Sequence, residues 1–184
     1  MNTTTSTSTA VLWTLDATHS SVGFSVRHMM ITNVRGEFQK FSGEVAYDPA
    51  NPGATKISAA IDVASIHTRE AARDAHLRSP DFFNAEQFPT ITFASRSVDR
   101  AGDGLVVVGD LSIRGVSREV RLTVDEMSAE HTDPWGNRRI GAAAKTKIRR
   151  SEFGITWNTA LELGGVLVGD EITIHIEASL VRQA

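Results

Sequence analysis

Apolar and polar residues alternate with a period of two along most of the chain, the pattern of half-buried β-strands. In the segment 21–27, for example, Val22, Phe24 and Val26 fall on one face and polar or small residues on the other. The same alternation predicts strands at 57–63, 90–98, 105–113, 118–126, 139–148 and 172–180. Because each strand has one apolar and one polar face, the pattern favours an antiparallel sheet over a buried parallel one.

One predicted strand changes parity along its length. Its apolar positions are even-numbered from Val34 to Phe38 and odd-numbered from Phe41 to Tyr47. A β-bulge near Gln39 and Lys40 would restore one continuous apolar face. A bulge of this kind would also help a long strand to bend around a barrel.

Turn-forming residues separate the predicted strands, at 48–53, 101–104, 114–115 and 133–137. Only the segment 69–83 breaks the period of two. It predicts a short helix from Arg69 to Arg78 and a turn that starts at Ser79, inserted between two strands so as to cap one end of the sheet.

The chain is therefore expected to form one all-β domain over residues 11–184, an up-and-down antiparallel β-barrel of about eight strands with a short helical insertion. Closure into a barrel would leave no unpaired sheet edge. The Thr- and Ser-rich residues 1–10 cannot bury apolar surface, so they predict a disordered tail.

Composition narrows the function classes. Hydrophobic residues make up 41% of the chain and charged residues 22%, with a net charge of −3, which does not favour a nucleic-acid partner. The sequence contains no cysteine, so disulfides, thiolate nucleophiles and cysteine-bound metals are excluded. No segment resembles a secretory signal or is apolar for long enough to span a membrane, and we therefore expect a cytoplasmic protein without an integral membrane segment.

Whether the barrel is hollow is the central functional question. Many positions predicted to face inward are small: Gly36, Gly43, Ala59, Gly109, Ala142, Ala144 and Ala178. They alternate with larger apolar residues: Phe24, Val26, Phe38, Phe41, Phe93, Leu111 and Ile113. Since protein cores are densely packed, so many small residues favour a hollow interior. In the alternative interpretation the aromatic rings fill the space and the glycines serve only sheet curvature.

A hollow barrel with this apolar lining would hold a hydrocarbon ligand, with polar groups confined to the mouth. The polar cluster of the predicted helix offers Arg73, His76 and Arg78 as candidates for binding an anionic head group there. The alternative is a solvated helix face held by local ion pairs.

A second candidate segment is 149–158, where Phe153, Ile155 and Trp157 alternate and would share one face. Phe153 and Trp157 either line or gate the cavity, or serve as core aromatics beside a glycine-rich loop. The sequence contains no common catalytic motif, and its six histidines are scattered without metal-ligand spacing. We therefore predict no catalytic residue, no metal site and no cofactor other than a bound lipid.

Several segments together carry a family resemblance. They are WTLDATHSSVGFSVRHM, NVRGEFQKFSGEVAYDP, RDAHLRSPDFFNAEQFPTITFAS, GDLSIRGVSREVRL, DPWGNRRIGAAAKTKIRRSEFGITWN and LELGGVLVGDEITIHIEASL. In this order they span about residues 13–181 and resemble the YceI-like family of polyisoprenoid-binding proteins. The resemblance implies a lipocalin-like antiparallel barrel whose elongated pocket holds an isoprenoid or another long-chain amphiphile. The family tends to carry an acidic residue where this chain has His67.

Three functions remain open from the sequence. The first is a module that binds, sequesters or transports a long-chain isoprenoid or fatty ligand, alone or as a homodimer. The second is an enzyme that acts on such a lipid at the barrel mouth. The third is a solid structural or stress-response barrel.

Overall fold

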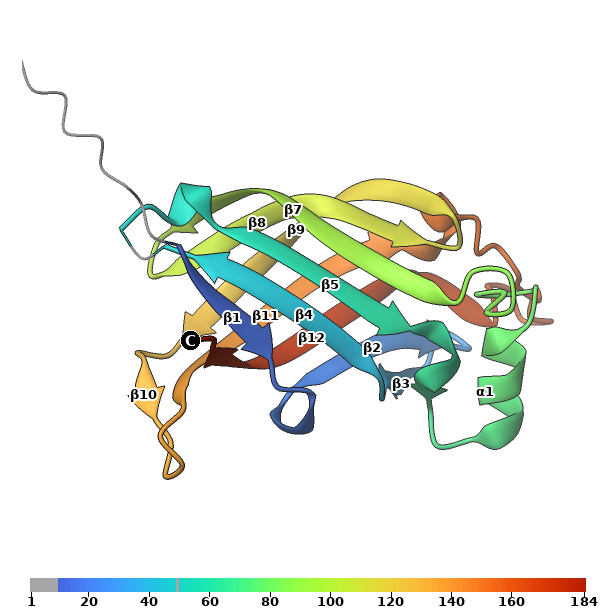
Figure 1. Ribbon diagram of the computed structural model, residues 1–184. Helices are drawn as coiled ribbons and strands as arrows, with labels where there is room; N and C mark the ends of the chain where they lie inside the picture. Colours follow the sequence, from blue (N-terminus) through green and yellow to red (C-terminus); the bar gives the residue numbers. More distant parts are fainter. Residues whose placement is uncertain (1–9, 49) are drawn as a thin grey trace, which may run out of the picture.

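The computed structural model describes residues 10–48 and 50–184, and antiparallel strands dominate it (Figure 1). The predicted disordered tail, apart from Ala10, lies outside the described residues. The strands are β1 (Val11–Leu15), β2 (Ser21–His28), β3 (Thr32–Phe38), β4 (Phe41–Tyr47), β5 (Lys56–Asp62), β6 (Ile66–His67), β7 (Thr90–Ala101), β8 (Gly104–Ile113), β9 (Val116–Met127), β10 (His131–Thr132), β11 (Arg138–Arg149) and β12 (Val168–Arg182).

The helical elements are short. The α-helix α1 (Ala71–Arg78) is joined by four 3-10 helices, η1 (Ala17–His19), η2 (Pro52–Ala54), η3 (Val63–Ser65) and η4 (Arg150–Phe153). In the described part of the chain, no helix has both the length and the apolar character needed to cross a bilayer.

Eight strands form a closed antiparallel ring. Hydrogen bonding joins β11, β9, β8, β7, β5, β4, β1 and β12 in that order. The ring closes where β12 returns to β11, in a continuous register from Arg139 opposite Val181 to Arg149 opposite Glu171. The predicted all-β barrel of about eight strands is confirmed.

The ring branches at one end. On its second edge β12 pairs with β1 at Leu180–Arg182 and with β2 between Val168 and Glu177. Strands β2, β3 and β6 therefore continue outside the ring, and α1 lies beside them at this end of the barrel, as predicted (Figure 1). Leu77 of α1, with Phe82 and Phe83 of the turn that follows, packs into the apolar core there.

The predicted bulge at Gln39 and Lys40 is wrong. Instead β3 ends at Phe38 and β4 begins at Phe41, and the two strands pair with different neighbours. The break is needed because β3 follows β2 out of the ring, whereas β4 stays between β1 and β5. The parity change itself is present, since Phe38 and Phe41 both line the barrel interior.

An ion-pair network joins two loops through Arg139 of β11. The Arg139 guanidinium on β11 lies 2.8 Å from the Asp16 carboxylate and 2.7 Å from that of Asp133. Hydrogen bonds from Thr18, Arg139 and His19 hold the pKa of Asp16 well below its ordinary value of 3.8. The bond from Arg139 is also the largest cause of the lowered pKa of Asp133. The network thus ties the β1–β2 connection to the loop before β11.

These lowered pKa values predict acid-dependent stability. Both carboxylates have a lower pKa in the folded than in the unfolded chain, so their contribution is present above the ordinary value of 3.8 and is lost as the pH falls below it. We expect Arg139→Gln to lower the melting temperature at neutral pH by a few degrees. It should also flatten the decline of the melting temperature between about pH 5 and pH 3, followed by circular dichroism.

Arg138→Gln is the matched control on the same strand. The Arg138 side chain is 52% exposed and pairs with Glu130. An exposed pair of this kind contributes under about 1 kcal/mol. If the two variants showed the same acid profile, the network around Arg139 would not be the source of the acid dependence.

Candidate ligand-binding cavity

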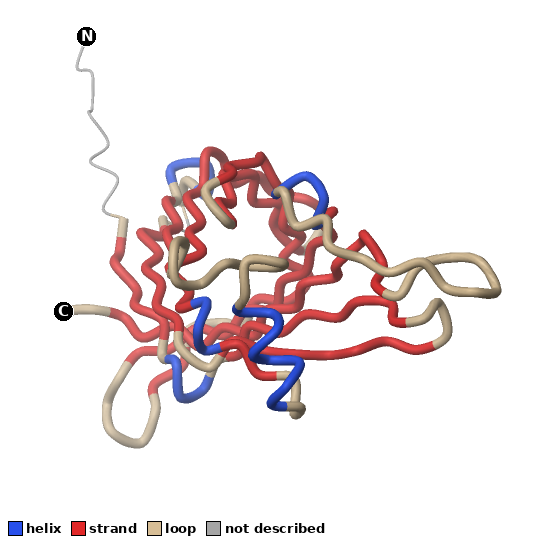
Figure 2. The backbone as a smooth tube through the Cα atoms, turned by 90° about the vertical axis from the view of Figure 1, so that its right-hand side faces the viewer, coloured by secondary structure: helices blue, strands red, loops and turns tan. Residues whose placement is uncertain are grey.

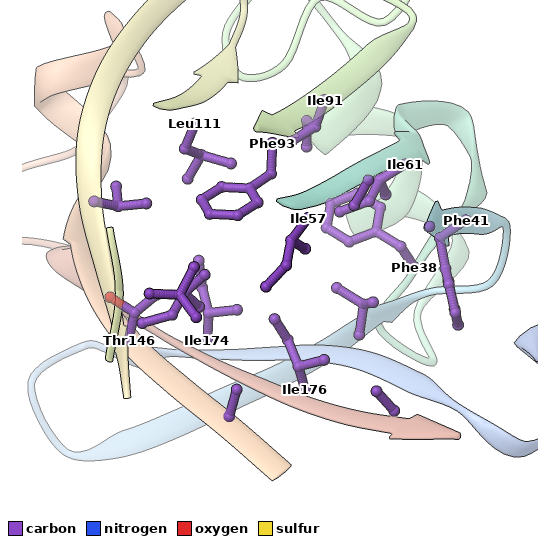
Figure 3. Close-up of a pocket in the computed structure, with 18 of the residues that line it drawn as sticks. Phe38, Phe41, Ile57, Ile61, Ile91, Phe93, Leu111, Thr146, Ile174 and Ile176 are labelled. Atoms are coloured by element: carbon purple, nitrogen blue, oxygen red, sulfur yellow. The ribbon is translucent and has the colours of Figure 1, made fainter. Parts of the chain in front are cut away.

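A cavity of about 330 Å³ runs through the barrel interior. Its wall extends from Trp13 and Tyr47 at one end to Phe83 and Ile155 at the α1 end, and apolar side chains dominate it (Figure 3). This volume lies within the range of about 300–1,000 Å³ that is typical of small-molecule pockets. The interior is therefore hollow, and the solid barrel considered from the sequence is not what the chain forms.

Among the larger residues predicted to line the cavity, all but Trp157 lie on the wall, whereas Gly36 and Gly109, also predicted to face inward, do not. The residues on it are Phe24, Val26, Phe38, Phe41, Phe93, Leu111, Ile113, Ala142, Ala144 and Phe153. Strand alternation alone was enough to place the residues of β2, β8 and β11 on the inner face. In Figure 3 Phe93, Leu111, Ile57 and Ile174 point into the same space from different strands.

Two glycines explain how aromatic residues line the barrel without filling it. A Cβ atom on Gly36 would overlap the ring of Phe24, which faces it across the β2–β3 pair. A Cβ atom on Gly109 would likewise overlap the ring of Phe93. Each ring therefore occupies the space above a glycine on the neighbouring strand, close to the wall. Any larger residue at Gly36 or Gly109 would force these rings toward the centre.

Trp157 lies outside the cavity wall, which corrects the prediction. The segment 153–157 is not a strand, because η4 ends at Phe153 and coil follows, so alternate residues do not share a face. Phe153 and Ile155 are buried on the wall, whereas the Trp157 ring packs against His76 and Phe82, with centroids 4.7 Å and 5.3 Å away.

The arginines predicted to bind a head group serve the neighbouring backbone instead. Arg73 donates from Nε to the Thr68 hydroxyl and from a terminal nitrogen to the Thr68 carbonyl, both at 2.7 Å. Arg78 donates to the carbonyls of Ala64 and Ile66. Neither side chain lies on the cavity wall. Both arginines thus join α1 to the segment before it.

His76, the third head-group candidate, is also engaged outside the cavity. Its Nε2 lies 2.9 Å from the Asp81 carboxylate, and its ring makes edge contacts with Phe82 and Trp157. Across residues 10–48 and 50–184, no three His, Cys, Asp or Glu side chains gather as a metal site would require.

His67 faces a buried carboxylate. Its Nδ1 lies 3.4 Å from Asp74 of α1, which is only 5% exposed. Burial acts to raise the pKa of Asp74, but hydrogen bonds from Thr68 and the nearby charges of His67 and Arg78 outweigh it and lower the pKa. His67 thus stabilises the carboxylate of Asp74 in the first turn of α1.

The cavity wall also contains a buried charge that the sequence interpretation missed. Arg150 is 6% exposed and lies on the wall at the α1 end. Its guanidinium donates to four backbone carbonyls, those of Ile155, Trp157, Val168 and Gly169. Burial lowers its pKa. The even-numbered residues of β11, from Ile140 to Ile148, face inward, and Arg150 continues this pattern. The alternation could therefore have predicted that Arg150 lies on the cavity wall.

Other wall residues come from the insertion after β6. Leu77, Phe82 and Phe83 reach the cavity from α1 and the turn that follows it. The Phe83 ring meets Phe38 at 5.9 Å in an edge contact. Strand periodicity contains no information about these contacts, because they depend on how the helix docks.

Comparison with known proteins identifies the relatives of this barrel. The model of the YceI-like domain matches residues 13–180. A UPF0312 protein of Photorhabdus laumondii is 37% identical over 86% of this chain and 80% of its own. The crystal structure of Burkholderia cenocepacia BcnA superimposes with a TM-score of 0.78 at 26% identity, over 90% of this chain and 98% of the other. A polyisoprenoid-binding domain from Saccharophagus degradans shares the fold, with a TM-score of 0.67 at 16% identity over 95% and 99% of the two chains.

The glycine below Phe24 provides a test of how the cavity is kept open. We expect Gly36→Ala to push the Phe24 ring and the Thr68 methyl group aside and to lower the free energy of unfolding by about 1–3 kcal/mol. Urea denaturation measures this loss. In the matched variant Gly23→Ala, the new Cβ meets nothing closer than 3.6 Å, and stability should change by less than about 1 kcal/mol. Equal stability of the two variants would contradict this role of Gly36.

Proposed function

The chain belongs to the YceI-like family, and from that premise we propose that it binds a long-chain isoprenoid or another amphipathic lipid inside the barrel and sequesters or transports it. The observation that carries the proposal is the apolar cavity that extends along the barrel from Trp13 to Ile155. The Saccharophagus degradans domain of the same fold, described as polyisoprenoid-binding, supports the choice of ligand class.

The energetics of such a site rest on the hydrocarbon chain. Each methylene group transferred from water to an apolar wall contributes about 0.8 kcal/mol. The wall offers few polar partners, among them Thr146, Ser58 and the buried Arg150. Affinity would therefore come mainly from chain burial, with loose selectivity for chain type.

No observation in the structure favours the alternative of an enzyme acting at the barrel mouth. His76 and Asp81 form a close pair, but His76 makes edge contacts with Phe82 and Trp157 and lies outside the cavity wall. We therefore propose binding rather than catalysis. The cytoplasmic location and the homodimer stay predictions.

Native mass spectrometry of the freshly purified protein tests this function directly. We expect a stoichiometric adduct in the mass range of a long-chain lipid, and the solvent extract of the same sample identifies its class. A bare protein mass that stays unchanged after incubation with a polyprenol and with a long-chain fatty acid would contradict the proposal.

Substitutions on β11 separate occupancy of the cavity from general damage. Ala142 and Ala144 lie on the wall, opposite Ala178 and Ile176 of β12. We expect Ala142→Phe and Ala144→Phe to fold and to bind less lipid, because each new ring takes up ligand space. Lipid uptake is measured by native mass spectrometry and folding by circular dichroism.

Ala143→Phe is the control for these variants. Ala143 lies between the two on the same strand, but it faces outward opposite Glu177, so lipid uptake should match that of the parent protein. Unchanged uptake in both inward variants would mean that the ligand does not occupy this part of the barrel.

A further inference from the structure

Exposed apolar side chains gather on two neighbouring turns at one end of the barrel. Met30 and Ile31, in the β2–β3 turn, are 58% and 69% exposed, and Met29 beside them is also exposed. Leu163, in the loop before β12, is fully exposed, and Val166 of the same loop is exposed as well. These five residues form what we call the apolar tip. The exposed Leu12, Met127 and Trp135 lie elsewhere.

The two turns of the apolar tip touch each other. The Met29 amide donates a hydrogen bond of 2.8 Å to the Leu167 carbonyl. The Met30 sulfur lies so close to Gly165 that a Cβ atom there would overlap it. In Figure 2 the two loops extend together beyond the strands on the right. The tip is thus one continuous surface built from segments more than a hundred residues apart.

Hydrogen bonds close both turns of the apolar tip at their bases. Asn158 makes two hydrogen bonds to the backbone of Val168, at 2.7 Å and 3.0 Å, and so fixes the base of the longer loop. The shorter turn is closed by a bond from the Ile31 amide to the His28 carbonyl. Turns that are already closed by hydrogen bonds lose less conformational freedom on binding.

The backbone of the shorter turn is unfavourable for its residues. Met29 and Met30 have φ angles of 49° and 61°, in the left-handed region. Tight hairpin turns with two such residues strongly prefer Asn and Gly. Two methionines here add strain and exposed apolar surface, and the fold gains no buried core in return. Strain that the fold itself does not use is a reason to look for function.

The tip continues the cavity wall. Val26 of β2 and Val168 of β12 both line the cavity, and each lies within a few residues of a tip turn. The ends of the strands that carry the two tip turns therefore belong to the cavity wall.

From these observations we propose that the apolar tip inserts into the surface of a lipid bilayer and brings the cavity to its ligand. This inference rests on the proposed lipid-binding function. A bilayer suits the tip better than a second copy of the chain does, because a fluid bilayer closes around a convex protrusion, whereas a protein partner would need a matching hollow. Glu162 on the tip and Arg27 at its base, beside Gly169, carry opposite charges. Insertion is thus driven by apolar burial and does not require anionic lipid.

Flotation of the purified full chain with phosphatidylcholine vesicles tests the proposal. We expect the parent protein to float with the vesicles, and Ile31→Ser combined with Leu163→Ser to lower the partition coefficient by about tenfold or more. A second variant, Met29→Asn with Met30→Gly, gives the turn the residues that its geometry prefers. It should melt no lower than the parent and still lose vesicle binding. Trp135→Ser, which removes an exposed side chain elsewhere, should bind as the parent does.

Two outcomes would overturn the tip as a membrane-inserting element. The first is the lack of vesicle binding that depends on the tip, seen either as parent protein that does not float or as tip variants that float as well as the parent. The second is a change of oligomeric state in the tip variants by analytical ultracentrifugation, which would make the tip a contact between copies. Loading with a polyprenol added from ethanol, without vesicles, tests the proposed function separately. It should be equal in parent and tip variants, and its failure in the parent would contradict lipid binding while leaving the flotation result intact.

Discussion

The pairing of β11 with β12 is the constraint on which the rest of the structure depends. It joins the last strand to the ring over eleven successive residue pairs, from Arg139 to Arg149, so that each of the eight ring strands has a partner on both sides. Closure also fixes which face of every strand points inward. The apolar positions of strands far apart in the chain, such as Phe24 and Leu111, then have to share one enclosed space.

Small residues on the strands, rather than large ones, determine how much of that space stays open. Alanines on β11 and the glycines below Phe24 and Phe93 keep side-chain volume at the wall, so a cavity of about 330 Å³ remains between apolar surfaces. An empty cavity of this size lowers the stability of the fold, because the side chains that line it lose packing contacts. A ligand that supplies those contacts would recover that stability.

The α1 end is organised differently from the other end. There β2 and β3 leave the ring, and the gap between ring and branch is occupied by α1, its aromatic turn and the segment that Arg150 holds. At this end Arg150 donates to the backbone carbonyls of Ile155 and Trp157, and Arg73 and Arg78 likewise donate to backbone carbonyls before α1. The apolar tip also projects from this branched region, so the irregular part of the barrel carries its most unusual surface.

The sequence by itself determined the all-β barrel, most of its strands, the short helix and the inward face of the regular strands. This succeeded because a period of two is a local property, and each residue of a strand shows its face by its own polarity. The same rule could have located Arg150, whose parity continues that of Ile148.

Only the tertiary structure decided the rest. The break at Gln39, the position of Trp157 outside the cavity and the use of Arg73 and Arg78 on backbone carbonyls depend on which elements meet in space. The same holds for the packing of aromatic rings against Gly36 and Gly109 and for the contact of Met30 with Gly165. Each of these is a contact between segments distant in the chain or a departure from regular strand geometry, and a local pattern of polarity contains no record of either.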